Sequence, residues 1–265
     1  MTNDLKKIVQ ENLEQATVKV STLTGFKGTG FFITPDGYIL TAWHCIEEFV
    51  RCHPYSSLVI ESEYHGRQFD VQLDQVDQEK SMKEKDIAVI KINYHPKTCV
   101  PLGILEEGHK GDEVISVGYP GGHIAGKDTV KVYPDCNISG LFKDNTAEIV
   151  GIQGKGHSGG LIYHYATQRV IGMATDLYKK EIMANAGLAI RFDFLLREQW
   201  LEANNEIAKV WDEHLAKFIP KIDNSQSPKP TESKTEVKPD FRGVKKIGKI
   251  ITTGDINNAK ELKIG

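Results

Sequence analysis

The stretch Gly154-Lys155-Gly156-His157-Ser158-Gly159-Gly160 holds a single serine in a run of glycines. Glycine tolerates backbone angles and close approaches that other residues cannot, so the hydroxyl of Ser158 can be pushed into solvent. The loop can also turn two backbone N–H groups, those of Gly156 and Ser158, toward one point beside the hydroxyl, as acyl transfer requires. Ser158 is therefore a candidate nucleophile. A lone G-x-S-x-G pattern leaves open a turn without chemistry, so partners elsewhere in the chain must decide.

A serine hydroxyl needs an imidazole to take its proton and a carboxylate to orient that imidazole. Among the nine histidines, His44 closes a segment, residues 30–44, that is typical of two strands joined by a Pro-Asp-Gly turn. We expect His44 to end the second of these strands. Among the acids, Asp86 stands directly before the apolar run 87–92, where an ionised carboxylate fits the orienting role. The predicted catalytic residues are thus His44, Asp86 and Ser158.

These residues lie in three motifs that resemble those of trypsin-like serine peptidases, in that family's order of His, Asp and Ser. The motifs are Thr41-Ala42-Trp43-His44-Cys45, Asp86-Ile87-Ala88-Val89-Ile90 and Gly156-His157-Ser158-Gly159-Gly160. Three motifs in order are a strong signal where one would be weak. Further matches at 117–122, 170–175 and 187–190 look like the bacterial, HtrA-type branch. The resemblance implies a serine endopeptidase, which cleaves proteins or peptides and needs no cofactor. HtrA-type proteases usually carry a PDZ domain, but we expect none here because the segment 244–265 is too short for one.

Many short segments with strand character, separated by turn signals and without alternating helices, predict an all-β fold. The resemblance implies two antiparallel six-stranded β-barrels with the catalytic residues in the cleft between them. Helical spacing and a change of composition predict the flanking elements. The predicted division is an N-terminal helix at 1–16, the peptidase domain at 17–198, a C-terminal helix at 199–220, a flexible linker at 221–243 and a short β-like tail at 244–265.

Composition is typical of a soluble globular protein. The chain has 265 residues, of which 40% are hydrophobic, and a formal net charge of −3, which gives no reason to expect a nucleic-acid partner. The first residues, 1–14, lack the apolar core of a signal peptide, and no stretch approaches membrane-spanning length. We therefore expect a cytoplasmic protein without a membrane partner.

The four cysteines agree with a reducing compartment, because they show no framework spacing. In secreted relatives, the resemblance implies a disulfide from the position of Cys45 to the one occupied here by Thr29, so Cys45 has no such partner. A zinc site of His44, Cys45, Cys52 and His53 is a competing interpretation. Its spacing is unlike the usual short Cys-x-x-Cys ligand pairs, so we predict no metal.

Three other interpretations compete with the peptidase. An α/β-hydrolase esterase needs a helix directly after Ser158 and a late catalytic histidine, and neither His164 nor His214 is well placed for that role. A protease-fold binding module would have lost its chemistry; all three catalytic positions are filled, but His157 leaves the oxyanion hole in doubt. His157 itself could serve Ser158, although neighbouring residues in extended backbone point in opposite directions.

The family's spacing also implies a primary specificity pocket, with its floor near Ile152. The residues predicted to line it are Ile152, Thr175, Asp176, Leu177 and Gly187. Since nothing acidic lies at that floor, we expect small or apolar residues before the cleaved bond rather than Lys or Arg.

The resemblance also bears on regulation. Secreted trypsins are activated when a freed N-terminus pairs with an Asp beside the catalytic serine; His157 occupies that position here, so we expect control by other means. The tail at 244–265 is rich in β-branched residues and follows a Pro-containing polar linker, which is typical of a docking peptide for a sensor or activator protein. By analogy we expect a protease of bacterial antiviral defence, with general protein quality control as the alternative.

Overall fold

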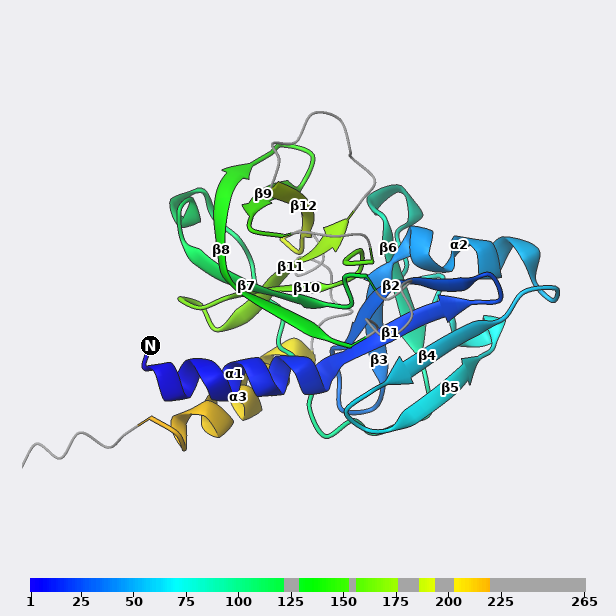
Figure 1. The fold of residues 1–265 in the computed structure, drawn as a ribbon, viewed down its shortest axis with the longest axis horizontal. Coiled ribbons are helices and arrows are strands. Elements are labelled where there is room, and N and C mark those ends of the chain that lie inside the picture. The colour runs from blue at the N-terminus through cyan, green and yellow to red at the C-terminus, as the bar shows by residue number, and fades with distance from the viewer. Residues whose placement is uncertain (122–128, 153–155, 176–185, 194–202, 220–265) are drawn as a thin grey trace, which may run out of the picture. The chain divides into compact units, whose positions relative to one another are not determined.

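The computed structural model describes residues 1–121, 129–152, 156–175, 186–193 and 203–219 (Figure 1). The helices in these ranges are α1 Asn3–Ala16, α2 Trp43–Cys52 and α3 Ala203–Ala216, with 3-10 turns η1 Leu73–Gln75, η2 Lys83–Lys85 and η3 Glu107–His109. The first six strands are β1 Thr17–Thr22, β2 Gly25–Phe32, β3 Tyr38–Ala42, β4 Leu58–Ser62, β5 Arg67–Val71 and β6 Ile87–Lys91. The next six are β7 Glu113–Gly118, β8 Lys131–Leu141, β9 Thr146–Val150, β10 Leu161–His164, β11 Arg169–Thr175 and β12 Ala186–Arg191. None of the described helices is long and apolar enough to cross a membrane.

The first sheet is antiparallel throughout and has the strand order β5-β4-β1-β2-β3-β6. Its last strand, β6, is an apolar run whose first four residues are buried, as expected for a strand covered on both faces. The two edges approach each other, because Val76, which follows β5, forms an isolated antiparallel bridge with Ile90 of β6. The amide of Asp77 also donates to the carbonyl of Val89 at 2.9 Å. The sheet thus curls back on itself through a single bridge.

The second sheet closes into a barrel with the strand order β10-β11-β12-β9-β8-β7. Figure 1 shows this barrel beside the first sheet, and the two are in contact through β1 and β7, β2 and β7, and β3 and β11. The prediction of an all-β fold built from two antiparallel six-stranded units is confirmed. It needs one correction: in the described residues only the second unit closes through its strands, because β5 and β6 do not pair directly.

One hydrophobic core joins the sheets to the two terminal helices. The buried apolar residues of α1 are Leu5, Val9, Leu13 and Ala16. Trp211 and Leu215 of α3 belong to the same cluster, together with residues of both sheets. Since burying one large apolar side chain contributes roughly 1.5–3 kcal/mol, these helices add to the stability of the β-structure beneath them.

Polar contacts fix α3 to the segment between the two sheets. The side chain of Asn204 accepts a hydrogen bond from the amide of Leu102 at 2.7 Å and donates one to its carbonyl at 2.9 Å. The side chains of Asn12 in α1 and His214 in α3 are joined at 3.2 Å. The two helices therefore hold the inter-sheet segment, and each other, by side-chain hydrogen bonds.

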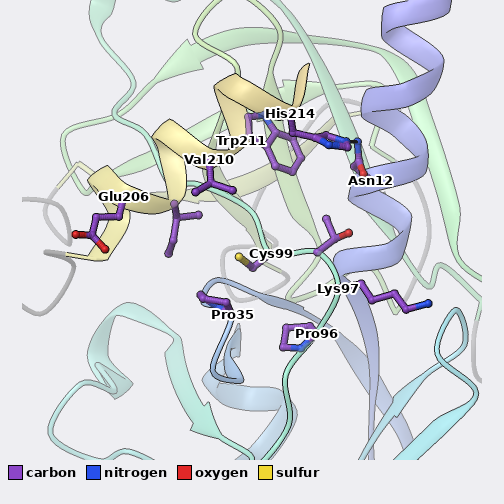
Figure 2. A pocket seen from close by; sticks show the side chains of 11 residues that line it. Asn12, Pro35, Pro96, Lys97, Cys99, Glu206, Val210, Trp211 and His214 are labelled. Atoms are coloured by element: carbon purple, nitrogen blue, oxygen red, sulfur yellow. Dashed lines mark hydrogen bonds between the residues drawn. The ribbon is translucent and has the colours of Figure 1, made fainter. Parts of the chain in front are cut away.

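A cavity of about 350 Å³ lies between these helices and residues 96–99 (Figure 2). Figure 2 shows Trp211 and His214 of α3 and Asn12 of α1 around it, with Pro35 and Pro96 from the loops opposite. Of the described residues that the sequence assigned to catalysis or substrate binding, none is in its lining. The cavity is thus separate from the predicted site.

One local prediction is wrong. His44 does not end a strand, because β3 stops at Ala42 and α2 begins at Trp43. The amide of Trp43 donates to the carbonyl of Asp86 at 3.0 Å, and this bond starts the helix at the point where the pairing of β3 with β6 ends. The predicted terminal helices correspond in place to α1 and α3, whereas the predicted linker at 221–243 and tail at 244–265 lie outside the described residues.

Candidate active site

Asp86 lies at the buried centre of the predicted site. It ends η2 and precedes β6, with a backbone φ of +56° in the left-handed region, which Asp adopts more readily than most residues. Its side chain is 0% exposed. A buried carboxylate is costly unless donors surround it, so its partners define the local structure.

His44 provides two of these donors from the first turn of α2. Its backbone amide donates to Oδ1 of Asp86 at 2.9 Å, and its ring Nδ1 lies 2.8 Å from Oδ2 and 3.0 Å from Oδ1. The N-cap residue of α2, Ala42, has no side chain that can cap the helix. The carboxylate of Asp86 acts in its place, and the positive end of the helix stabilises the negative charge.

The same pair sets the protonation of the imidazole. Burial lowers the pKa of His44, but the hydrogen bond and charge of Asp86, together with Cys45, outweigh this effect, and the pKa is raised above the ordinary value of 6.5. The side chain of His44 stays 27% exposed while the carboxylate is fully enclosed. The ring is therefore oriented with Nδ1 toward Asp86 and Nε2 away from it, where it can exchange a proton with another group.

A third donor comes from the barrel. Thr175, the last residue of β11, donates from Oγ1 to Oδ2 of Asp86 at 2.7 Å. The prediction placed Thr175 in the wall of the specificity pocket, and no signal in the sequence pointed to Asp86 as its partner. The two residues are 89 positions apart, and they meet where β3 contacts β11.

Ser158 lies on the first sheet although it belongs to the barrel half of the chain. Its carbonyl accepts the amide of Thr29 in β2 at 2.8 Å and lies 3.8 Å from Sγ of Cys45, the neighbour of His44. A side chain at Gly28 would overlap both, since its Cβ would lie 2.5 Å from that carbonyl oxygen and from Sγ of Cys45. The serine is therefore held against the start of α2.

The described residues contain a hydrogen bond between His44 and Asp86 but none between His44 and the hydroxyl of Ser158. Catalytic hydrogen bonds are often long without substrate and shorten when it binds. The structure thus brings the imidazole of His44 and the carboxylate of Asp86 together, and brings the backbone of Ser158 to Cys45, the neighbour of His44.

The backbone around Ser158 is fixed by bonds to both sheets. The carbonyl of Gly156 accepts Oγ1 of Thr29 at 3.1 Å, and the amide of Gly159 donates to the carbonyl of Ala174 at 2.8 Å. Gly156 and Gly159 have φ values of +94° and +84°, which require glycine. Within the described residues, the amides of Gly156 and Ser158 donate to no acceptor. These are the two N–H groups predicted to form an oxyanion hole.

Thr29 is a functional residue that sequence reasoning missed. Its Oγ1 donates to Gly156 and accepts the amide of Tyr119 at 2.9 Å, while its carbonyl accepts Oγ1 of Thr41 at 2.6 Å. The sequence marked this position only as one where secreted relatives carry a cysteine. The side chain that replaces it forms a hydrogen-bonded link between β2 and the serine loop.

The predicted specificity pocket is described in part. Ile152 is buried, and its side chain lies against Gly187, where an added Cβ would be 3.2 Å from the Ile152 side chain. Asp176 and Leu177 lie outside the described residues. The floor and one wall of the predicted pocket are thus apolar and adjacent.

His157 points away from the serine. Its Nε2 is hydrogen-bonded to Oγ of Ser116 in β7, inside the barrel. The interpretation in which His157 serves as the base for Ser158 is not supported by this orientation.

Among the described residues, one group brings three atoms of metal-ligand type within 4.8 Å of one another: His109, Asp112 and His164. The ring of His164 is already bonded on both sides, with Nε2 3.0 Å from Oδ2 of Asp112 and Nδ1 3.0 Å from Oγ1 of Thr167. This group satisfies its hydrogen bonds within the protein, and we assign no metal to it.

The fold and the site together define a class. Two antiparallel six-stranded sheets, with a histidine oriented by a buried aspartate where they meet, are characteristic of chymotrypsin-like peptidases. The family model of the trypsin-like peptidase domain matches residues 28–173, more than half of the chain. The chain belongs to this family.

One curated relative is similar in sequence, and solved structures share the fold. A probable periplasmic serine endoprotease, DegP-like, from Rickettsia prowazekii (strain Madrid E) is 26% identical over 158 residues, which are 57% of this chain and 28% of that protein. A serine endoprotease from Yersinia pestis superimposes with a TM-score of 0.56 at 20% identity, over 79% of this chain and 68% of that one. An inactive form of Rv3671c from M. tuberculosis H37Rv gives 0.54 at 19% identity, over 74% and 91%. The chain therefore spans about a quarter of the DegP-like relative's length.

Proposed function

We propose that the protein is a serine endopeptidase, with His44, Asp86 and Ser158 as its catalytic triad. The observation that carries this proposal is the buried carboxylate of Asp86 on Nδ1 of His44. In the reaction, Oγ of Ser158 bonds to the substrate carbonyl carbon while Nε2 of His44 takes the hydroxyl proton. That proton passes to the leaving amine as the C–N bond breaks, and water then hydrolyses the acyl-enzyme.

The amides of Gly156 and Ser158 would stabilise the tetrahedral intermediate. Both N–H groups lack an acceptor within the described residues, and the backbone around them is tied to β2 and β11. Preorganised donors of this kind need no rearrangement when negative charge develops on the carbonyl oxygen.

A serine-directed fluorophosphonate probe tests the nucleophile. The unaltered chain should be labelled, and Ser158→Ala should abolish labelling. Ser139→Ala, which changes an exposed serine of β8, is the matched control and should label normally. Equal labelling of the Ser158→Ala variant would exclude Ser158 as the nucleophile.

For the substrate we propose a protein with a small or apolar residue before the cleaved bond. The apolar contact of Ile152 with Gly187 supports this, because it offers no partner for a buried Lys or Arg. Cleavage of a peptide library gives the test. A profile dominated by basic residues at this position would refute the proposal and point to Asp176 as a pocket residue.

We further propose a regulated cytoplasmic enzyme that a sensor or activator protein recruits through residues 244–265, in bacterial antiviral defence. All four cysteines are unpaired, which supports a reducing compartment, and the tail sequence has the β-branched composition of a docking peptide. Pull-down with the whole chain and with a variant lacking 240–265 tests recruitment. Loss of one specific partner supports it, whereas an unchanged set of partners, or many unfolded substrates, favours general protein quality control.

A protease-fold binding module is the second candidate. The observation that favours it is the lack of a hydrogen bond between His44 and the hydroxyl of Ser158 in the described residues. The two candidates differ in one measurement: the binding module would capture its partner protein intact and leave the fluorophosphonate probe unreacted.

A further inference from the structure

His157 is buried inside the barrel, next to the serine but facing away from it. The residue is 3% exposed, and its Nε2 is hydrogen-bonded to Oγ of Ser116, which is itself 0% exposed. Buried polar side chains require such a partner, so this hydrogen bond satisfies both groups and links the serine loop to β7. The triad chemistry leaves this contact without a role.

The ring fits a slot that two glycines and an aromatic side chain make for it. The ring of Tyr133 in β8 meets it edge-on, with centroids 5.6 Å apart. A Cβ at Gly118 would lie 3.3 Å from the imidazole, and one at Gly160 would lie 3.1 Å from it. Both distances are tighter than ordinary packing, so the ring has little freedom to shift within the slot.

The backbone of His157 connects this slot to the proposed oxyanion hole. Its carbonyl accepts the amide of Gly160 at 2.7 Å. A trans peptide unit is planar, with C=O and N–H on opposite sides. Fixing the carbonyl of His157 toward Gly160 therefore turns the amide of Ser158 the other way, out of the turn. Gly156, the residue directly before His157, carries the amide that is the second proposed donor.

We infer that His157, held by Ser116, is the positioning residue that keeps the amides of Gly156 and Ser158 directed at the substrate oxyanion. The inference rests on the proposed function, which it extends by assigning the side chain that sets the oxyanion hole. His157 touches neither the substrate nor the reacting atoms, and it acts through the backbone on either side.

The test compares kcat with substrate affinity. In His157→Ala, kcat should fall by about 100-fold, the scale of losing one oxyanion donor, while KM stays within about two-fold. Ser116→Ala removes only the partner and should lower kcat in the same sense by a smaller factor. His157→Gln keeps a group that can reach Ser116 and should recover part of the loss.

His164 offers a matched control, since it is another fully buried histidine with hydrogen bonds at both ring nitrogens, at the far end of β10. His164→Ala should lower thermal stability but leave kcat per folded molecule unchanged. If His157→Ala and His164→Ala lower activity only in proportion to the folded fraction, the positioning role is refuted. Ser116→Ala decides the matter if His157→Ala does not fold.

Failure of the proposed function would look different. If the unaltered chain neither cleaves peptides nor reacts with the fluorophosphonate, the peptidase proposal falls. The positioning role is then decided by amide NMR shifts of Gly156 and Ser158: large changes in Ser116→Ala with little change elsewhere uphold it, and unchanged shifts refute it.

Discussion

At the scale of single residues, Asp86 determines most of the site. One carboxylate receives the backbone amide and ring of His44 and the hydroxyl of Thr175. The contacts come from two stretches of chain, the start of α2 and the end of β11, and they meet at a residue with a left-handed backbone. The side chain of Asp86 thus links the orientation of the imidazole, the start of α2 and the attachment of the barrel.

Asp86→Asn should change both the rate and its pH dependence. His44 accepts a proton only when neutral, and its pKa is raised by the Asp86 contact, so kcat/KM of the unaltered chain should rise with pH through a pKa above 6.5. Without the negative charge this pKa falls, and the rising limb should move to lower pH. The plateau should fall about 10⁴-fold, as when the orienting carboxylate is neutralised in serine proteases. A limb that stays in place would contradict the assignment.

Thr175→Val should destabilise the fold, because it leaves Oδ2 of the buried Asp86 with one donor fewer. Hydrogen bonds to charged groups contribute about 1.5–3 kcal/mol, and the free energy of unfolding should fall by that amount. Urea denaturation measures it. Thr175→Ser retains the hydroxyl and loses only the methyl group, so it serves as the control and should lose less than Thr175→Val. An unchanged free energy of unfolding in Thr175→Val would contradict the role of the hydrogen bond.

At the scale of elements, α3 holds the segment between the sheets by one asparagine. Asn204→Ala removes the partners of both the amide and the carbonyl of Leu102, which is buried. Leaving buried backbone groups unpaired should lower the free energy of unfolding by about 1–3 kcal/mol. The neighbouring exposed residue supplies the control, since Asn205→Ala should stay within about 0.5 kcal/mol. Similar values for the two variants in urea denaturation would rule out this role for Asn204.

Elements whose burial is local could be predicted from the sequence, and those set by distant contacts could not. The apolar run of β6 and the helical spacing of α1 can each be recognised from the local sequence alone. The start of α2 at Trp43 depends on the carbonyl and carboxylate of Asp86, more than forty residues away, and strand propensity before His44 suggested the opposite. Tertiary capping overrode a local pattern there.

The site follows the same rule. His44, Asp86 and Ser158 could be proposed because their motifs carry a recognisable order. Thr175 and Thr29 have no distinctive neighbours in sequence, and their roles come from side-chain hydrogen bonds between the first-sheet half and the barrel half of the chain. A hydroxyl that orients a carboxylate is identified by geometry alone.

At the scale of the whole molecule, the reactivity of the four thiols distinguishes the folded chain from the unfolded one. Cys52 is exposed, Cys45 is buried, and burial raises the pKa of Cys99 and of Cys136 to about 11. A raised pKa means less thiolate, so at pH 8 a disulfide reagent should react with one thiol quickly and with the others slowly. Cys52→Ser should remove the fast phase. The unfolded chain, prepared without reductant, should titrate four thiols; fewer would reveal a disulfide.

The junction of the two sheets has a consequence for how the molecule fails. His44 and Asp86 belong to the half of the chain that forms the first sheet, whereas Ser158 and Thr175 belong to the barrel half. A displacement of about 1 Å between reacting groups can cost about 100-fold in rate. On gentle heating, turnover should therefore be lost while circular dichroism still shows intact strands. A compound that binds at the junction of the two sheets would inhibit the enzyme without contacting the nucleophile.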